Sequence, residues 1–107
     1  MRCPIIICSW LRVDGMALFP FILIKRKGID YKSQLIFHER IHIRQQLELL
    51  VLPFYVLYFF NYLINLLRYK THYKAYRNII FEREAFENDT NPDYLERRRF
   101  WAFLSYL

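Results

Sequence analysis

At 107 residues the chain is long enough for one folded domain and too short for two of ordinary size. Aromatic residues make up 20% of it and charged residues 24%, so an apolar core is expected, with apolar side chains left over for the surface. The net charge of +6 would suit a nucleic acid or an anionic membrane, but the basic residues are scattered, which argues against nucleic acid. We expect most of them on solvated faces and loop ends, with a membrane surface as the second interpretation.

The two cysteines, Cys3 and Cys8, have an odd separation that would place them on opposite faces of a strand. We expect no bridge between them, which weakly favours a reducing compartment. The apolar run after Arg2 is too short for a secretory signal, and no small-residue cleavage site follows it. We therefore expect a cytoplasmic or membrane-associated protein without a signal peptide.

Two apolar runs, residues 5–13 and 16–24, flank Asp14-Gly15. An Asp-Gly pair between two apolar runs is a strong signal for a β-hairpin. We predict an antiparallel hairpin within residues 1–28. Pro20 should place the second strand at a sheet edge or a bulge, because proline cannot donate to the ladder.

The rest of the chain, residues 29–107, has a helical pattern. Asp30 or Ser33 can cap a first helix over residues 31–52, and Pro53 kinks or ends this helix.

Thr71 is a candidate cap for a further helix over residues 72–88, and Asn91-Pro92 should start a last helix that reaches about residue 106. The predicted fold class is α+β, mostly α, in one domain over residues 1–107: a hairpin followed by three to four helices.

The stretch His38-Glu39-Arg40-Ile41-His42 fits the pattern H-E-x-x-H. Helix residues four apart share a face, so His38 and His42 can offer two nitrogens to one Zn²⁺ ion, which accepts them at about 2.0–2.1 Å. Glu39 can take the proton of a zinc-bound water and pass it to the leaving amine. The alternative is a charged helix whose histidines are incidental.

A catalytic zinc needs a third protein ligand and an open position. Gln45 and Glu48 stand where a metzincin has its glycine and its third ligand, and without the glycine the helix has no reason to turn. We therefore reject that class. Three later glutamates remain as candidates: Glu82, Glu84 and Glu87.

The segment Glu82-Arg83-Glu84-Ala85 reads E-x-E-A. Together with H-E-x-x-H it resembles the gluzincin metallopeptidases, especially the membrane-associated HtpX-like and prenyl-protein-processing zinc peptidases and small uncharacterised bacterial proteins of minimal gluzincin type. The resemblance covers residues 34–88. It implies a zincin-like fold, Zn²⁺ as cofactor, a peptide or protein substrate, and Glu82 as the third ligand. Those peptidases usually have an aspartate after the alanine, where this chain has Phe86.

Helical spacing supports Glu82 independently, because Asn78, Glu82 and Ala85 would share one helix face. The small Ala85 would let this helix approach the active-site helix, and Asn78 would hold the ligand carboxylate or a histidine. The alternative for Glu82 is a surface carboxylate paired with Arg77 or Arg83.

Residues 49–67 carry no charge and, at about 1.5 Å per residue, would nearly cross a hydrocarbon core of about 30 Å. A straight span would separate the histidines from the third ligand. The metal hypothesis therefore requires sharp turns near Pro53 and Thr71, and we prefer the bent form because Asn61 and Asn65 suit a bundle interior.

In gluzincins an edge strand before the active-site helix pairs with the extended substrate. The resemblance implies this role for the strand that begins with Ala17, Leu18 and Phe19; the alternative is a plain hairpin packed on the helix. Zincins also stabilise the oxyanion with a Tyr, His or Arg side chain. The sequence leaves four candidates open: His72, Tyr73, Tyr76 and Arg77.

The sequence thus predicts a minimal zinc metallopeptidase of gluzincin type, with His38, His42 and Glu82 on the metal and Glu39 as general base. Its rivals are a non-catalytic, zinc-stabilised or degenerate relative and a small membrane protein without metal.

Overall fold

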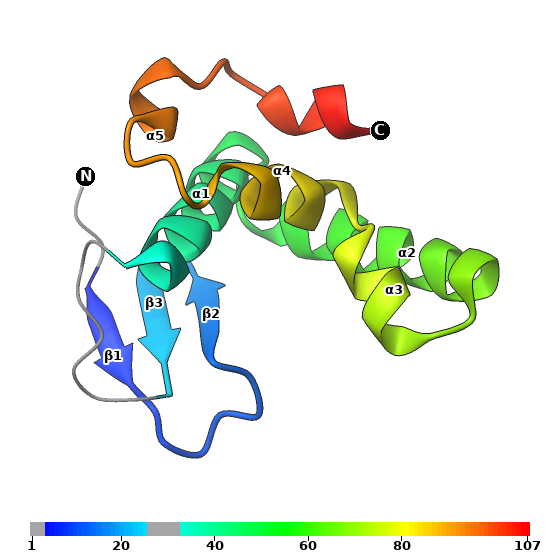
Figure 1. Ribbon diagram of the computed structural model, residues 1–107, viewed down its shortest axis with the longest axis horizontal. Helices are drawn as coiled ribbons and strands as arrows, with labels where there is room; N and C mark the ends of the chain where they lie inside the picture. The colour runs from blue at the N-terminus through cyan, green and yellow to red at the C-terminus, as the bar shows by residue number, and fades with distance from the viewer. Residues whose placement is uncertain (1–3, 26–32) are drawn as a thin grey trace.

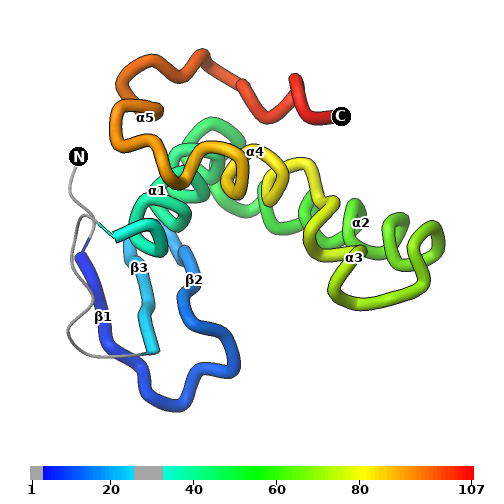
Figure 2. Tube along the Cα trace, in the orientation of Figure 1, coloured from blue at the N-terminus to red at the C-terminus, as the bar shows by residue number. Residues whose placement is uncertain are grey.

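The computed structural model describes residues 4–25 and 33–107 (Figure 1). A small sheet lies at one end, helix α1 packs against it, and the remaining helices extend away from it (Figures 1 and 2). This confirms the predicted fold class, α+β and mostly α. Cys3 and the alternative cap Asp30 lie outside the described residues.

The sheet has three strands in the order β1-β3-β2: β1 (Ile5–Ile7), β2 (Gly15–Leu18) and β3 (Phe21–Ile24). β1 runs parallel to β3, with Ile5 opposite Ile22. β2 runs antiparallel to β3, with Leu18 opposite Phe21. The central strand is therefore β3, and β2 is the edge strand nearest α2 and α3 in Figure 1.

The predicted hairpin about Asp14-Gly15 is wrong. The hairpin is formed by β2 and β3 and turns at Phe19-Pro20, where Pro20 needs no ladder partner. The reason is burial: one face of the second run, which includes the paired residues Ala17 and Ile22, packs on α1. The chain between β1 and β2 is mostly exposed and forms a connection.

Helix α1 (Gln34–Glu48) begins after Ser33, whose Oγ accepts a hydrogen bond from the backbone N–H of Ile36 (3.3 Å). Leu50 and Val51 then adopt positive φ angles of 62° and 65°. This break bends the chain by 113° into α2 (Leu52–Tyr69). The sharp turn lies where the metal hypothesis required it, although the first helix ends instead of kinking, and Pro53 lies in the first turn of α2.

Within the described parts of the chain, no helix by itself has the length and apolarity of a membrane span. Only the pair α1 and α2 together does, and it is bent.

Thr71 caps α3 (His72–Arg77) as predicted, by accepting a hydrogen bond from the backbone N–H of Lys74. The expected single helix over residues 72–88 is wrong, because the chain leaves the helix at Asn78 and restarts as α4 (Ile80–Asn88). The expected last helix is also broken, into α5 (Tyr94–Arg97) and the 3-10 helix η1 (Ala102–Tyr106).

Two apolar clusters hold these elements. One joins the sheet to α1 through residues that include Ile22, Ile24 and Ile36. The other joins α2, α4 and η1 through Phe54, Phe81 and Phe103, together with Ile79 before α4. The site described below lies where α1 and α4 pack against each other, between the two clusters.

Candidate metal centre

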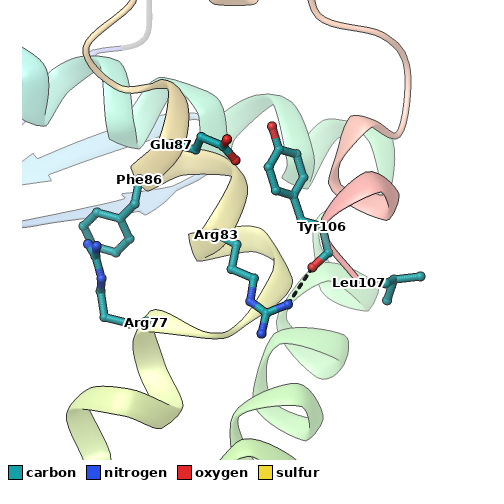
Figure 3. A pocket seen from close by; sticks show the side chains of 6 residues that line it. All are labelled: Arg77, Arg83, Phe86, Glu87, Tyr106 and Leu107. Carbon is teal, nitrogen blue, oxygen red and sulfur yellow. Dashed lines mark hydrogen bonds between the residues drawn. The ribbon is translucent and has the colours of Figure 1, made fainter.

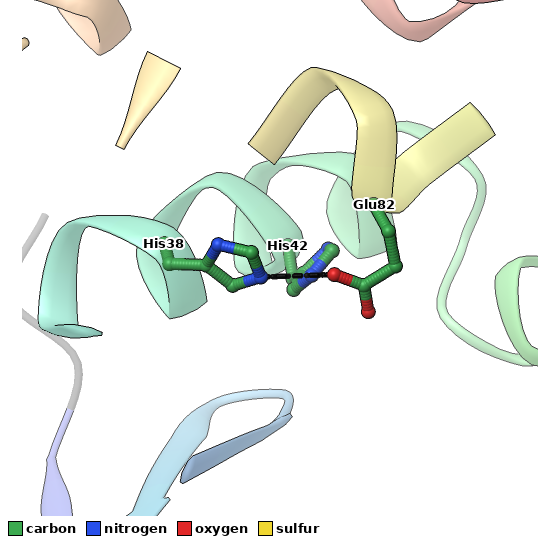
Figure 4. Close-up of side chains that lie close together, drawn as sticks. All are labelled: His38, His42 and Glu82. Carbon is green, nitrogen blue, oxygen red and sulfur yellow. Dashed lines mark hydrogen bonds and ion pairs between the residues drawn. The ribbon is translucent and has the colours of Figure 1, made fainter. Parts of the chain in front are cut away.

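Three side chains from two helices converge on one point (Figure 4). In α1, His38 and His42 lie one turn apart, and α4 supplies Glu82. The Nε2 atoms of His38 and His42 lie 2.9 Å and 3.0 Å from Glu82 Oε1, and 3.2 Å from each other. All three residues are at most 5% exposed. The predicted ligands therefore meet, although 40 residues separate His42 from Glu82.

The other two candidate glutamates lie elsewhere. Glu84 is fully buried and accepts hydrogen bonds from the Arg98 guanidinium (Nη2, 3.0 Å), the Tyr94 hydroxyl (2.6 Å) and Gln45 Nε2 (2.9 Å). Glu87 is exposed. Among the described residues, the group that can hold a metal consists of the two histidines and Glu82.

Each histidine is held by a hydrogen bond at Nδ1, the ring nitrogen that does not approach Glu82. His38 Nδ1 lies 2.9 Å from a carboxylate oxygen of Asp89, and His42 Nδ1 lies 2.7 Å from the amide oxygen of Gln45. The Gln45 amide is oriented by its own NH₂ group, which donates to the Phe81 carbonyl oxygen. Because both partners are acceptors, both Nδ1 atoms carry the proton.

It follows that both Nε2 atoms present a lone pair to the carboxylate oxygen of Glu82. Three acceptors within 3.2 Å of one another repel unless a cation lies among them, either a proton or a metal ion. Burial lowers the pKa of His42, but the Glu82 carboxylate outweighs burial and raises it to about 9. Burial likewise raises the pKa of Glu82, but the two imidazoles outweigh it and hold this pKa well below its usual range.

The residues fit a zinc ion. Ligand atoms at about 2.05 Å from a tetrahedral zinc lie about 3.3–3.4 Å apart. The three atoms here are separated by 2.9–3.2 Å, so a movement of a few tenths of an ångström makes room for the ion. Two imidazoles held through Nδ1 and one carboxylate form a donor set found in catalytic zinc sites.

Tyr58 of α2 holds the second oxygen of the ligand carboxylate. Its hydroxyl donates a 2.6 Å hydrogen bond to Glu82 Oε2. Burial, followed by the charge of Glu82, raises the pKa of Tyr58, which therefore keeps its proton. Glu82 is thus positioned from α2 as well as from its own helix.

Glu39 lies beside the three ligands, with its side chain buried against β2. A β-carbon added to Gly15 would lie 3.2 Å from Glu39 Oε2 and 2.9 Å from Leu35 Cδ1, so any larger residue here would have to displace these two side chains. Burial raises the pKa of Glu39, although the electrostatic interactions with His42 and then with His38 oppose the shift.

Two cavities of about 900 Å³ and 410 Å³ flank Glu39. His38 and Asp89 line the larger one, and His42 and Glu82 line the smaller one. Residues shared by both include Gly15, Glu39, Tyr58 and Tyr76. The two cavities therefore adjoin each other in a cleft between the edge of the sheet and helices α2 and α3, and Glu39 borders both of them.

The four oxyanion candidates separate in the structure. Tyr76 lines both cavities, and its pKa is raised by burial and by the charges of Glu82 and Glu39. His72 and Tyr73 line the larger cavity, and His72 Nδ1 is hydrogen-bonded to the Tyr62 hydroxyl (2.8 Å). Arg77 instead lies over the Phe86 ring and borders another pocket, of about 460 Å³ (Figure 3). Of the four candidates, Tyr76 is thus the one that borders both cavities.

The predicted support by Asn78 is wrong. Asn78 lies at the break between α3 and α4, donates to the Lys74 carbonyl oxygen (2.8 Å) and accepts from Arg83 (3.0 Å). Ala85 is fully buried on α4, which packs against α1, as the expected close approach requires.

Side chains of the protein itself already occupy part of the backbone edge of the predicted substrate strand. The Gln46 side chain donates to the Ala17 carbonyl oxygen (2.8 Å) and accepts from the Phe19 N–H (2.9 Å). The Tyr55 hydroxyl also donates to Ala17 (3.2 Å). The Ala17 carbonyl oxygen and the Phe19 N–H therefore point away from β3. Because the backbone groups of alternate residues point to the same side of a strand, the N–H and C=O of Gly15 and the N–H of Ala17 lie on the same outer edge of β2.

Sequence reasoning missed Asp89, Tyr58 and the role of Gln45. Asp89 lies three residues after Phe86, the position at which the resemblance led us to look for an aspartate. Tyr58 belongs to a series of polar residues at helical spacing in an otherwise apolar segment, and that spacing was the available signal. Gln45 follows His42 by three residues, on the same helix face.

No protein-family model, curated protein or solved structure matches this chain.

Proposed function

We propose that the protein is a zinc-dependent peptidase. The observation that supports the proposal is the convergence of three buried side chains that can bind a metal, two of them held through Nδ1, beside a buried glutamate that borders two cavities. A site for metal alone would need neither the glutamate nor the cleft.

His38, His42 and Glu82 would hold the ion. When bound, zinc supplies a Lewis acid that polarises a peptide carbonyl and lowers the pKa of a water molecule to about 7. Glu39 accepts the proton of the attacking water and returns it to the leaving nitrogen. A raised pKa suits a carboxylate that must take up and release a proton near neutral pH.

Tyr76 is the proposed oxyanion donor. Its hydroxyl stays protonated because burial and the neighbouring carboxylates raise its pKa, and it borders both halves of the cleft. A neutral donor of this kind stabilises negative charge that develops on the carbonyl oxygen. Tyr58 is committed to Glu82 and serves the ligand.

The substrate is an extended peptide that adds a strand to β2. Gly15 and the N–H of Ala17 provide the outer edge, and both residues border the cleft. Gln46 and Tyr55 donate hydrogen bonds to the Ala17 carbonyl oxygen, so this oxygen is not free to pair with a peptide. Pairing is therefore expected at residues 15–17 and not across Phe19.

Metal stoichiometry and hydrolysis of a peptide mixture test the proposal together. The wild type should bind one zinc ion and cleave peptides, and Glu39→Gln should keep the zinc and lose about 10²–10⁴-fold in rate. Glu82→Ala should lose both. Glu87→Ala is the matched control, because this exposed residue lies on the same helix. A zinc-loaded wild type without activity would favour the non-catalytic rival, and a wild type without zinc would refute the site.

A further inference from the structure

Helix α2 exposes an unbroken apolar surface along its whole length. Every exposed side chain within residues 52–67 is apolar, and we call these side chains the outer face of α2. They include Phe59, Phe60, Ile64 and Leu67, which are 57%, 56%, 56% and 81% exposed. At 100° per residue the outer face covers an arc of about 160°, on a helix about 27 Å long. An exposed surface of this extent marks an interaction site.

The polar side chains of the same segment all face the protein. Each of them is buried or half-buried and hydrogen-bonded to another element: Tyr55, Tyr58, Asn61, Tyr62 and Asn65. For example, Asn61 accepts from the backbone N–H of Ile80 (2.8 Å), and Asn65 donates to the Ala75 carbonyl oxygen (3.1 Å). The amphipathicity of α2 is therefore inverted, with polar groups inside and apolar groups outside. A helix of this kind suits an apolar medium on its outer face.

The charged residues that directly follow the outer face in the chain are all basic. Four exposed basic residues follow the outer face: Arg68, Lys70, Lys74 and Arg77. Residues 49–81 contain no aspartate or glutamate. The nearest acid before them, Glu48, has a side chain only 5% exposed and is paired with Arg98. The segment thus offers cations beside an apolar surface and no exposed acid to neutralise them.

We propose that the outer face of α2 docks on a membrane that contains anionic lipids, with the helix in the plane of the interface. The apolar side chains lie among the acyl chains, and Arg68, Lys70 and Lys74 lie at the level of the headgroups. A second copy of the chain fits less well. A parallel contact between two outer faces would bring like charges together, and an antiparallel one would place the cations against residues 50–53, which carry no acid. Anionic headgroups complement the cations directly.

Co-sedimentation of the full chain with vesicles tests this proposal without reference to zinc or activity. The vesicles are phosphatidylcholine alone, or phosphatidylcholine mixed with phosphatidylglycerol. The wild type should bind the mixed vesicles more tightly, and added salt should weaken that preference. Arg68→Gln with Lys70→Gln should lower the partition coefficient on the mixed vesicles by about 25-fold, at about fivefold per charge, and leave phosphatidylcholine binding unchanged.

Phe60→Gln with Ile64→Gln should lower binding to both kinds of vesicle by about tenfold or more. Trp10→Gln is the control, because Trp10 is 78% exposed and lies in the connection between β1 and β2. Circular dichroism verifies that each variant is folded. If the variant with the Phe60 and Ile64 changes does not fold, the variant with the Arg68 and Lys70 changes still tests the proposal. A wild type that stays in the supernatant, or binds both vesicles equally, would overturn the proposal. A dimer in solution that the Phe60 and Ile64 changes dissociate would assign the outer face to a second copy instead.

Discussion

The substitution Asp89→Asn tests whether the carboxylate behind His38 determines metal affinity. Asp89 is 2% exposed, and its two oxygens accept hydrogen bonds of 2.9 Å from His38 Nδ1 and from Gln34 Nε2. Asparagine keeps the shape of the side chain but offers one acceptor in place of two and carries no charge. One of the two donors therefore faces an NH₂ group, and the imidazole becomes less basic and less well oriented.

Partners of this kind contribute about 10–100-fold to zinc affinity, which corresponds to about 1.4–2.7 kcal/mol. Competition for zinc against a fluorescent chelator measures the change in Kd. The matched control is Asp93→Asn, because Asp93 is exposed and follows in the next turn. We expect the Kd to rise 10–100-fold for Asp89→Asn and to stay unchanged for the control. A folded Asp89→Asn protein with wild-type affinity would refute the reasoning that Asp89 directs His38 toward the metal.

Four further outcomes are expected. Arg98→Met should lower the free energy of unfolding by about 3–5 kcal/mol in urea denaturation, because Glu84 and Glu48 both lose their counter-ion. A second change, Glu84→Met, should recover part of the loss, and no recovery would contradict the ion-pair account. Tyr58→Phe removes the hydrogen bond to the Glu82 carboxylate and should raise the zinc Kd by about tenfold in the same competition assay. An unchanged Kd would show that Glu82 does not need this hydrogen bond to bind zinc. Because the pKa of His42 is raised from 6.5 to about 9 in the folded protein, the stability that His42 contributes to the metal-free protein should be fully present below pH 6.5 and be lost as the pH rises through 9. A flat profile in pH-dependent denaturation would contradict the coupling to Glu82. Val51→Gly should raise the free energy of unfolding by about 1 kcal/mol, because a β-branched residue is strained at a φ of 65°. Thermal denaturation measures the change, and a loss of stability would contradict this account of the bend.

The fold class and the helical boundaries near caps followed from local chemistry. Ser33 and Thr71 cap the helices where their hydroxyls predicted it, and the chain bends next to Pro53. The strand pairing did not follow, because Asp14-Gly15 is a local signal. Burial against α1, which involves residues far along the chain, decided that β3 takes the central place.

The three proposed metal ligands could be chosen from the sequence because H-E-x-x-H places two of them on one helix face and residues 81–88 offer only three glutamates for the third place. The groups that hold those ligands could not. Asp89 acts from beyond the end of α4, and Tyr58 acts from a helix whose orientation depends on the bend of 113°. Asn78 was misassigned because a helix wheel assumes an unbroken helix, and the helix breaks at that residue.

The buried pair of Glu84 and Arg98 has a consequence for how the protein matures. Gln45, which orients His42, is itself held by Glu84, and Glu84 is neutralised by Arg98. On the ribosome all three ligands emerge before Arg98 does, so a nascent chain already displays them while Glu84 still lacks its counter-ion. For the proposed metal site, stable capture of an ion is therefore expected to follow the docking of the segment that carries Arg98, so metal loading would be a late event in biogenesis.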